Sequence, residues 1–295
     1  MESTSLHRWS WAALATNIMI VVTGGAVRVT GSGLGCSEWP ACEQGSVTPP
    51  PGGEAGWHVY VEFGNRLLSF VVLAAVVGAF LAARRELAEG HAVRRLTGWL
   101  IAGVLAQAVL GGITVRLDLH WATVMAHFLL SMVLIAVATV VVHRVRHGDA
   151  PEAADPLPTA RLVPALGAVV LVLGTIVTAT GPHAGDPGTD RLGLSIVEMA
   201  RFHGIAVWLT VGLTVLVLAQ ARRLGADRLA GAATALLGIE LAQGAVGYWQ
   251  YFTGVPAELV LVHMLLATLF WVAAVRVGLF ARDRVRDSVE PLAIP

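Results

Sequence analysis

Eight long apolar runs constrain this chain more than any other feature of its sequence. Hydrophobic residues occupy 56% of the 295 positions and charged residues 14%. A helix needs about 20 apolar residues to cross a bilayer, and such runs must be helical because lipid cannot satisfy an open backbone. The runs cover residues 9–29, 58–83, 96–116, 121–143, 162–181, 198–220, 228–252 and 257–281. The sequence therefore predicts an all-α membrane protein with eight transmembrane helices.

Arginine predicts the orientation of these helices, since the sequence contains no lysine. One set of helix ends is rich in arginine, for example at Arg84, Arg85, Arg94, Arg95, Arg222 and Arg223. The opposite loops hold only Arg28, Arg116 and Arg191. Positive residues favour the cytoplasmic side, so we expect a multi-pass protein of the cell membrane with both termini in the cytoplasm. The sequence shows no basic, aromatic-rich patch for a nucleic acid.

Matching positions in the two halves indicate an internal duplication. The pairs are Thr30 and Thr180, Asn65 and His203, Gln107 and Gln243, and His127 and His263. Duplicated helical units are common in membrane proteins. We therefore expect two pseudo-symmetric four-helix bundles, at residues 1–143 and 162–281. A cytoplasmic linker at 144–161 and a cytoplasmic tail at 282–295 complete the predicted organisation.

Three histidines and one asparagine lie at a common depth in the predicted helices. Asn65, His127, His203 and His263 each follow the start of their helix by about six residues, which places them roughly 10 Å below the outer surface. An ionisable ring in hydrocarbon is costly and usually functional, and paired imidazoles in a helical bundle are typical haem ligands. His203 and His263 are therefore predicted to hold a haem between them. The alternative is two buried histidines bonded to backbone carbonyls.

The predicted first-half site is less regular, because Asn65 takes the place of a second histidine and an amide is a poor iron ligand. A haem here would be held mainly by His127, with its other side weakly held or open. Such a site suits an exchangeable haem better than an electron carrier. The alternative is a decayed site in which Asn65 makes only a hydrogen bond. His58 lies about 10 Å higher on the same helix and is expected to be interfacial.

Glu62 and Arg66 flank Asn65 at the mouth of the same helix. The simpler interpretation is an i,i+4 ion pair, which contributes a few tenths of a kcal/mol. The functional interpretation places Glu62 over the macrocycle edge as a proton acceptor, with Arg66 on a propionate. Both cysteines, Cys36 and Cys42, fall in the first outer loop, where an oxidising compartment favours a local disulfide over free or metal-binding thiols.

Several of these segments resemble haem A synthases. The resemblance begins in the first outer loop, GGAVRVTGSGLG at 24–35 followed by CSEWPAC at 36–42. EFGNR at 62–66 is similar to that family's Glu-x-x-His-Arg motif, with Asn65 in place of the histidine. RFHG at 201–204 and VHMLLA at 262–267 resemble its second-half haem motifs. The resemblance covers essentially the whole chain, and GPHAGD at 181–186 is similar to actinobacterial members.

The resemblance implies that the protein oxidises the C8 methyl of haem O to a formyl group, giving haem A for terminal oxidase assembly. It implies haem b on His203 and His263, and substrate haem O on His127. It assigns the family's glutamate to Glu62 and its loop disulfide to Cys36 and Cys42. The implied partners are haem O synthase, oxidase assembly factors and an external electron acceptor.

Two other functions fit the same residues. A membrane b-type cytochrome would hold two tightly bound haems and yield no modified product, which the weakened first site disfavours. A non-catalytic haem carrier or assembly factor would bind haem O without oxidising it, an alternative that Asn65 makes harder to dismiss. A transporter is disfavoured because the histidines lie near the outer face, whereas transporter sites tend towards the midplane.

Overall fold

The computed structural model describes residues 5–49, 56–148 and 157–281. Within these ranges it contains eight helices that are long and apolar enough to cross a membrane. They are α1 (Ser5–Val29), α2 (His58–Glu86), α3 (Ala92–Arg116), α4 (Trp121–His147), α5 (Leu162–Thr180), α6 (Ile196–Arg223), α7 (Asp227–Phe252) and α8 (Ala257–Phe280), and a short 3-10 helix, η1 (Pro158–Arg161), precedes α5. The predicted all-α membrane fold with eight spanning helices is confirmed.

The helices extend beyond several predicted ends on the arginine-rich side. α2, α4 and α6 end at Glu86, His147 and Arg223, three or four residues after the apolar runs end. Arginine is a good helix former, and its charge is favourable at a helix C-terminus, so the helix continues after the hydropathy falls. The predicted linker therefore begins inside α4 and ends in η1. Its residues 149–156, and the tail at 282–295, lie outside the described residues.

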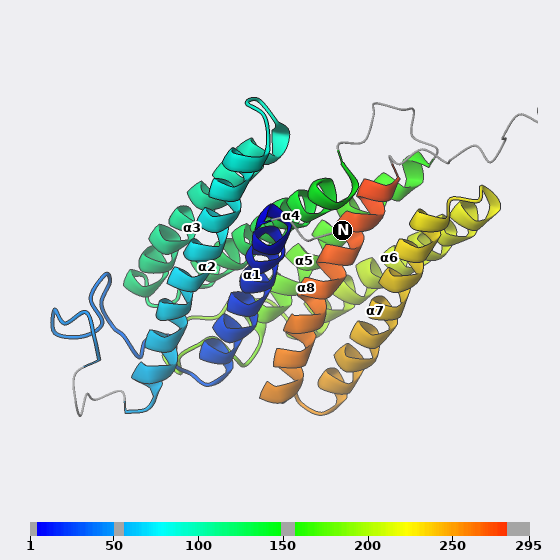
Figure 1. The fold of residues 1–295 in the computed structure, drawn as a ribbon. Helices are drawn as coiled ribbons and strands as arrows, with labels where there is room; N and C mark the ends of the chain where they lie inside the picture. The colour runs from blue at the N-terminus through cyan, green and yellow to red at the C-terminus, as the bar shows by residue number, and fades with distance from the viewer. Residues whose placement is uncertain (1–4, 50–55, 149–156, 282–295) are drawn as a thin grey trace, which may run out of the picture.

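The helices pack as two rings of four. Each of α1 to α4 contacts the next helix in sequence, and α4 contacts α1; α5 to α8 repeat this pattern. The rings meet through α1, α4, α5 and α8, where α1 contacts α8 and α4 contacts both α5 and α8. Figure 1 shows these four helices in the middle of the molecule, with α2 and α3 on one side and α6 and α7 on the other. This arrangement fits the predicted division into two bundles.

Close contacts hold the two rings together along α1. A Cβ atom at Gly25 would lie 2.5 Å from the sulfur of Met264 on α8, so the Met264 side chain packs directly on the backbone of α1. At the outer end of α1, the Arg28 guanidinium donates to the main-chain carbonyls of His183 and of Thr178, the latter at 3.0 Å. The first helix therefore joins both the core and the outer loop of the second ring.

Candidate functional site

The four residues predicted to share one depth stand at matching distances from the first residues of their helices. Asn65 and His203 lie seven residues after the first residue of α2 and α6, and His127 and His263 lie six residues after that of α4 and α8. This corresponds to roughly 9–10 Å along each helix axis. In the described part of the chain, α2 does not contact α4, and α6 does not contact α8. The members of each pair therefore lie on helices at opposite corners of a ring.

His203 is held by the main chain of α5. Its Nδ1 is 3.1 Å from the carbonyl oxygen of Val170. A carbonyl can only accept, so Nδ1 carries the hydrogen and Nε2 keeps its lone pair. The ring packs on Gly174, where a Cβ atom would lie 3.2 Å from Cε1. This is the orientation expected of a metal-ligating histidine, whose second nitrogen donates to a backbone carbonyl.

His263 is supported by α7 and lies near His203. Gln243 Nε2 donates to the main-chain carbonyl of His263 at 3.1 Å, and a Cβ atom at Gly247 would lie 3.3 Å from the ring's Cε1. The ring's Nδ1 is buried and has no hydrogen-bond partner among the described residues. His203 is near enough for its charge to act on His263, so the structure brings this predicted pair together.

His127 has the same support in the first ring. Gln107 Nε2 donates to the His127 carbonyl at 3.0 Å and to the Ser131 hydroxyl at 2.6 Å. A Cβ atom at Gly111 would lie 3.3 Å from Cε1 of His127. The Nδ1 atom is again buried, without a partner in the described ranges. The sequence repeat thus corresponds to a repeated set of contacts, in which a glutamine fixes the backbone and a glycine admits the ring.

Asn65 is held by a residue that sequence reasoning missed. The hydroxyl of Thr23 on α1 donates to Asn65 Oδ1 at 2.7 Å and also lies 3.2 Å from the carbonyl oxygen of Ile20. In the sequence repeat, Ile20 corresponds to Val170, whose carbonyl accepts the hydrogen bond from His203. Asn65, which accepts from Thr23, therefore occupies in the first ring the position that His203 has in the second ring, where the ring nitrogen donates to the Val170 carbonyl.

Glu62 and Arg66 form a buried ion pair at the mouth of α2. Glu62 is 5% exposed. One of its carboxylate oxygens accepts from two Arg66 nitrogens at 2.6 and 3.0 Å, and the other accepts from the Cys36 main-chain nitrogen at 2.7 Å. Arg66 also donates to the carbonyls of Cys36, Glu38 and Ala41. The predicted i,i+4 ion pair between Glu62 and Arg66 is therefore present. Both residues also hold the first outer loop through its main chain.

The first outer loop contains the predicted disulfide between Cys36 and Cys42. Trp39, in the middle of this loop, packs directly on Gly112 of α3, and Arg116 donates to its carbonyl at 3.0 Å. The loop therefore lies against the outer ends of α2 and α3, beside the level of the first-ring residues.

His58 lies at the outer end of α2, where the sequence predicts an interfacial residue. Its Nδ1 is 2.8 Å from the Ser32 hydroxyl, and its ring stacks on Trp57. It is therefore engaged with the loop rather than with the deeper asparagine.

Glu240 is a second buried carboxylate, and sequence reasoning missed it as well. It lies in the middle of α7 and is 4% exposed. One carboxylate oxygen accepts from the Thr214 hydroxyl at 2.9 Å, and the other is buried without a partner among the described residues. The corresponding residue in the first half of the repeat is Val104, so the repeat does not reveal Glu240. The available signal was an acidic residue deep in a spanning helix.

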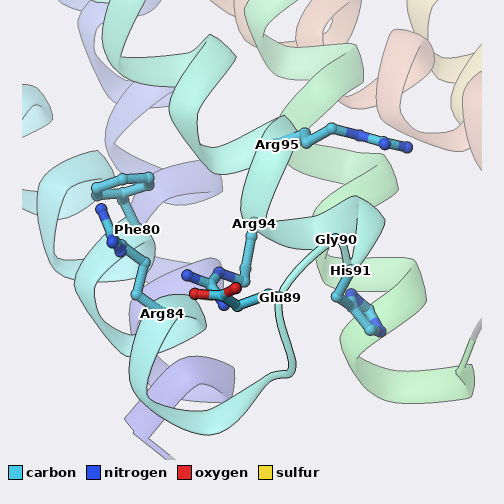
Figure 2. A pocket seen from close by; sticks show the side chains of 7 residues that line it. All are labelled: Phe80, Arg84, Glu89, Gly90, His91, Arg94 and Arg95. Atoms are coloured by element: carbon cyan, nitrogen blue, oxygen red, sulfur yellow. The ribbon is translucent and has the colours of Figure 1, made fainter.

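A hollow on the arginine-rich side is separate from these residues. Figure 2 shows it between the end of α2 and the start of α3, lined by Phe80, Arg84, Glu89, Gly90, His91, Arg94 and Arg95. Arg84 lies 19 residues after Asn65 on α2, or roughly 28 Å along its axis. The hollow therefore does not belong to the histidine level.

The donor set fits a haem better than a bare metal ion. The described residues contain no group of three or more histidine, cysteine or acidic side chains that could hold an ion alone. A haem iron needs only one or two axial ligands from the protein, because the porphyrin supplies the others. The imidazoles of His203 and His263 match that need, and the glycines beneath their rings leave room for them.

Comparison with known proteins identifies the family. The COX15-CtaA family model, described as cytochrome oxidase assembly protein, matches residues 7–58 and 54–184, together more than half of the chain. A heme A synthase from Azorhizobium caulinodans is 26% identical over 90% of this chain and 91% of its own length.

Other relatives match over shorter stretches. A heme A synthase from Geobacillus thermodenitrificans is 32% identical over 37% of this chain, and a protoheme IX farnesyltransferase from Thermus thermophilus is 30% identical over 36%. The matched stretches span 33% and 17% of the lengths of these two relatives. With its family model matched from the first helix to the end of the fifth, this chain belongs to the COX15-CtaA family of cytochrome oxidase assembly proteins.

Proposed function

We propose that this protein is a haem A synthase, which oxidises the C8 methyl group of haem O to a formyl group and so supplies haem A for terminal oxidases. The family match and the relatives named heme A synthase support this activity. The observation that carries the proposal is the asymmetry between two otherwise repeated sites. One ring presents two imidazoles, whereas the other presents His127 opposite Asn65.

His203 and His263 hold a haem b in the second ring. The carbonyl of Val170 fixes the tautomer of His203 and leaves Nε2 free to bind iron. Gln243 fixes the backbone that carries His263. Two axial imidazoles suit a resident haem, and such a haem supplies one-electron chemistry when bound.

His127 would hold haem O in the first ring, where the helix that carries Asn65 offers no second imidazole at this level. The Thr23 hydroxyl already occupies the Asn65 side-chain oxygen, so this amide is tied to α1. A single strong ligand suits a molecule that must enter as haem O and leave as haem A. The apolar helices around this level would accept its farnesyl tail.

Glu62 accepts a proton as the methyl group is oxidised. Its burial and its place one turn before Asn65 support this role, because a carboxylate in a dry site is an effective base. Arg66 stabilises the carboxylate and, through three loop carbonyls, holds the disulfide loop against α2. The Arg66 side chain is 22% exposed, and a haem propionate would lie at its open edge.

The protein resides in the cell membrane with both termini in the cytoplasm, as the arginine distribution predicts. The class of enzyme that farnesylates protoheme supplies the substrate, and oxidase assembly factors receive the product. Oxidation of a methyl group releases electrons, so an external electron acceptor is required. The match to a protein named protoheme IX farnesyltransferase supports the link to the preceding reaction.

The test is to express the full chain beside a haem O source, extract the haems and determine their masses. Appearance of the formyl product supports the proposed activity, and Glu62→Ala should retain bound haem without forming the product. Glu89→Gln is the matched control, because Glu89 is exposed and lies at the far end of the first ring. Bound but unchanged haem O would identify a carrier instead, the function that Asn65 makes harder to dismiss. Two tightly bound, reversible haems and no modified product would identify a b-type cytochrome.

A further inference from the structure

Glu240 lies in a setting where a negative charge is poorly supported. Both it and Thr214 are almost fully buried, at 4% and 0% exposed. The Thr214 hydroxyl donates the single hydrogen bond that the carboxylate receives from the described residues. A buried carboxylate with so little support is costly, whereas a carboxyl group that holds a proton is not. A small change in nearby charge can therefore decide whether Glu240 holds a proton.

One polar side chain lies between Glu240 and the imidazole level. Gln243 lies one turn closer to the outer surface on the same face of α7, and its amide nitrogen donates to the His263 carbonyl. Its side-chain oxygen is buried and has no donor in the described part of the chain. A proton on the free oxygen of Glu240 would create a donor one turn away from this acceptor. Glu240 itself lies about 4.5 Å deeper than Gln243.

The other charged groups deeper on the packed helices are arginines. α6 and α8 are the helices that contact α7. On α6, Arg222 is eight residues beyond Thr214, or about 12 Å deeper. On α8, Arg276 is 13 residues beyond His263, or roughly 20 Å deeper. On α6, His203 is 11 residues before Thr214, or about 16 Å nearer the outer surface. Both arginines keep their charge at ordinary pH, so a change of charge on these two helices near Glu240 would come from the level of His203 and His263.

From this arrangement we infer that Glu240 is a proton-binding site coupled to the second-ring haem. The inference rests on the haem b of the proposed function. When the ferric haem gains one electron, Glu240 takes up one proton from water on its unpaired oxygen; when that electron leaves, the proton returns. The electrons come from oxidation of the haem O methyl group. Proton uptake keeps the net charge of this apolar region constant. In the substrate half, the residue that corresponds to Glu240 is Val104. That half therefore has no such proton-binding site.

The experiment is a redox titration of the purified, haem-loaded protein over a series of pH values. The midpoint potential of the second-ring haem should fall as pH rises in the wild type, because protons stabilise the reduced state. Glu240→Gln should lose this dependence, because an amide cannot take up the proton. Glu89→Gln makes the same chemical change at an exposed site and should keep the wild-type slope. Glu240→Val, which copies the first half, is a second variant for the case in which the amide does not fold.

An independent readout is the redox infrared difference spectrum of the wild type, which should contain a carboxyl band that shifts in heavy water. An unchanged potential slope in Glu240→Gln, or a wild type with neither slope nor band, would overturn the inference while leaving the haem in place. A wild type that binds no haem in its second ring would overturn the proposed function, and with it this inference.

Discussion

Replacement of Gly247 by alanine should weaken haem binding in the second ring. The added Cβ would lie 3.3 Å from Cε1 of His263, closer than ordinary van der Waals contact, so the ring must move. The ring must give by a few tenths of an ångström, and a displacement of about 30° from its rotamer, which would cost about 0.5–1.5 kcal/mol, sets the upper bound. Since every 1.4 kcal/mol is a factor of ten in affinity, we expect haem to bind more weakly, by at most about 12-fold.

Gly244→Ala provides a matched control on the same helix. A Cβ atom there meets nothing within 4 Å, and both variants gain the same helix propensity from alanine. Haem affinity can be measured by transfer to an excess of apomyoglobin, followed in the Soret band, with circular dichroism as a check on folding. Equal transfer from the two variants would refute the argument that Gly247 is required by the position of the His263 ring.

The remaining predictions concern the ligands, the carboxylate and the loop. His203→Ala should lose the second-ring haem, and full Soret absorbance in this variant would contradict the assignment. Glu62→Ala should keep its haem but stall oxidation, and it should destabilise the protein by about 1–3 kcal/mol because the partly exposed Arg66 loses its carboxylate partner; normal haem A output would remove Glu62 from the mechanism. Asn65→His should add a second axial ligand in the first ring and slow haem release several-fold, which low-spin absorbance and exchange rates would detect. Removal of the Cys36–Cys42 bond should cost about 2 kcal/mol of loop entropy, and alkylation should then give the same mobility with and without reductant.

Much of the fold could be predicted because lipid restricts the possible structures. Each of the eight apolar runs became a helix, since no other open-chain conformation satisfies the backbone in hydrocarbon. The disulfide was predictable from the compartment of its loop. The helix ends were less predictable, since α4 continues to His147 through arginines that hydropathy excludes.

The repeat made only part of the site predictable. The repeat identified His127 and His263 and flagged Gln107 and Gln243, but it did not reveal that each glutamine donates to the carbonyl of its histidine. That contact depends on how two helices pack. Thr23 and Glu240 could not be predicted from the repeat, because in each case the corresponding residue of the other half is apolar. The roles of the predicted ligands stay predictions until haem binding is measured.

Helix α1 lies where the two rings meet and contacts residues near both sites. Thr23 touches Asn65 in one ring, and Gly25, two residues later, touches Met264 next to His263 in the other. A single helix backbone, about 5 Å across, is thus all that separates the neighbourhoods of the two sites along this route. A bulkier residue at position 25 would widen that barrier without touching either ligand set.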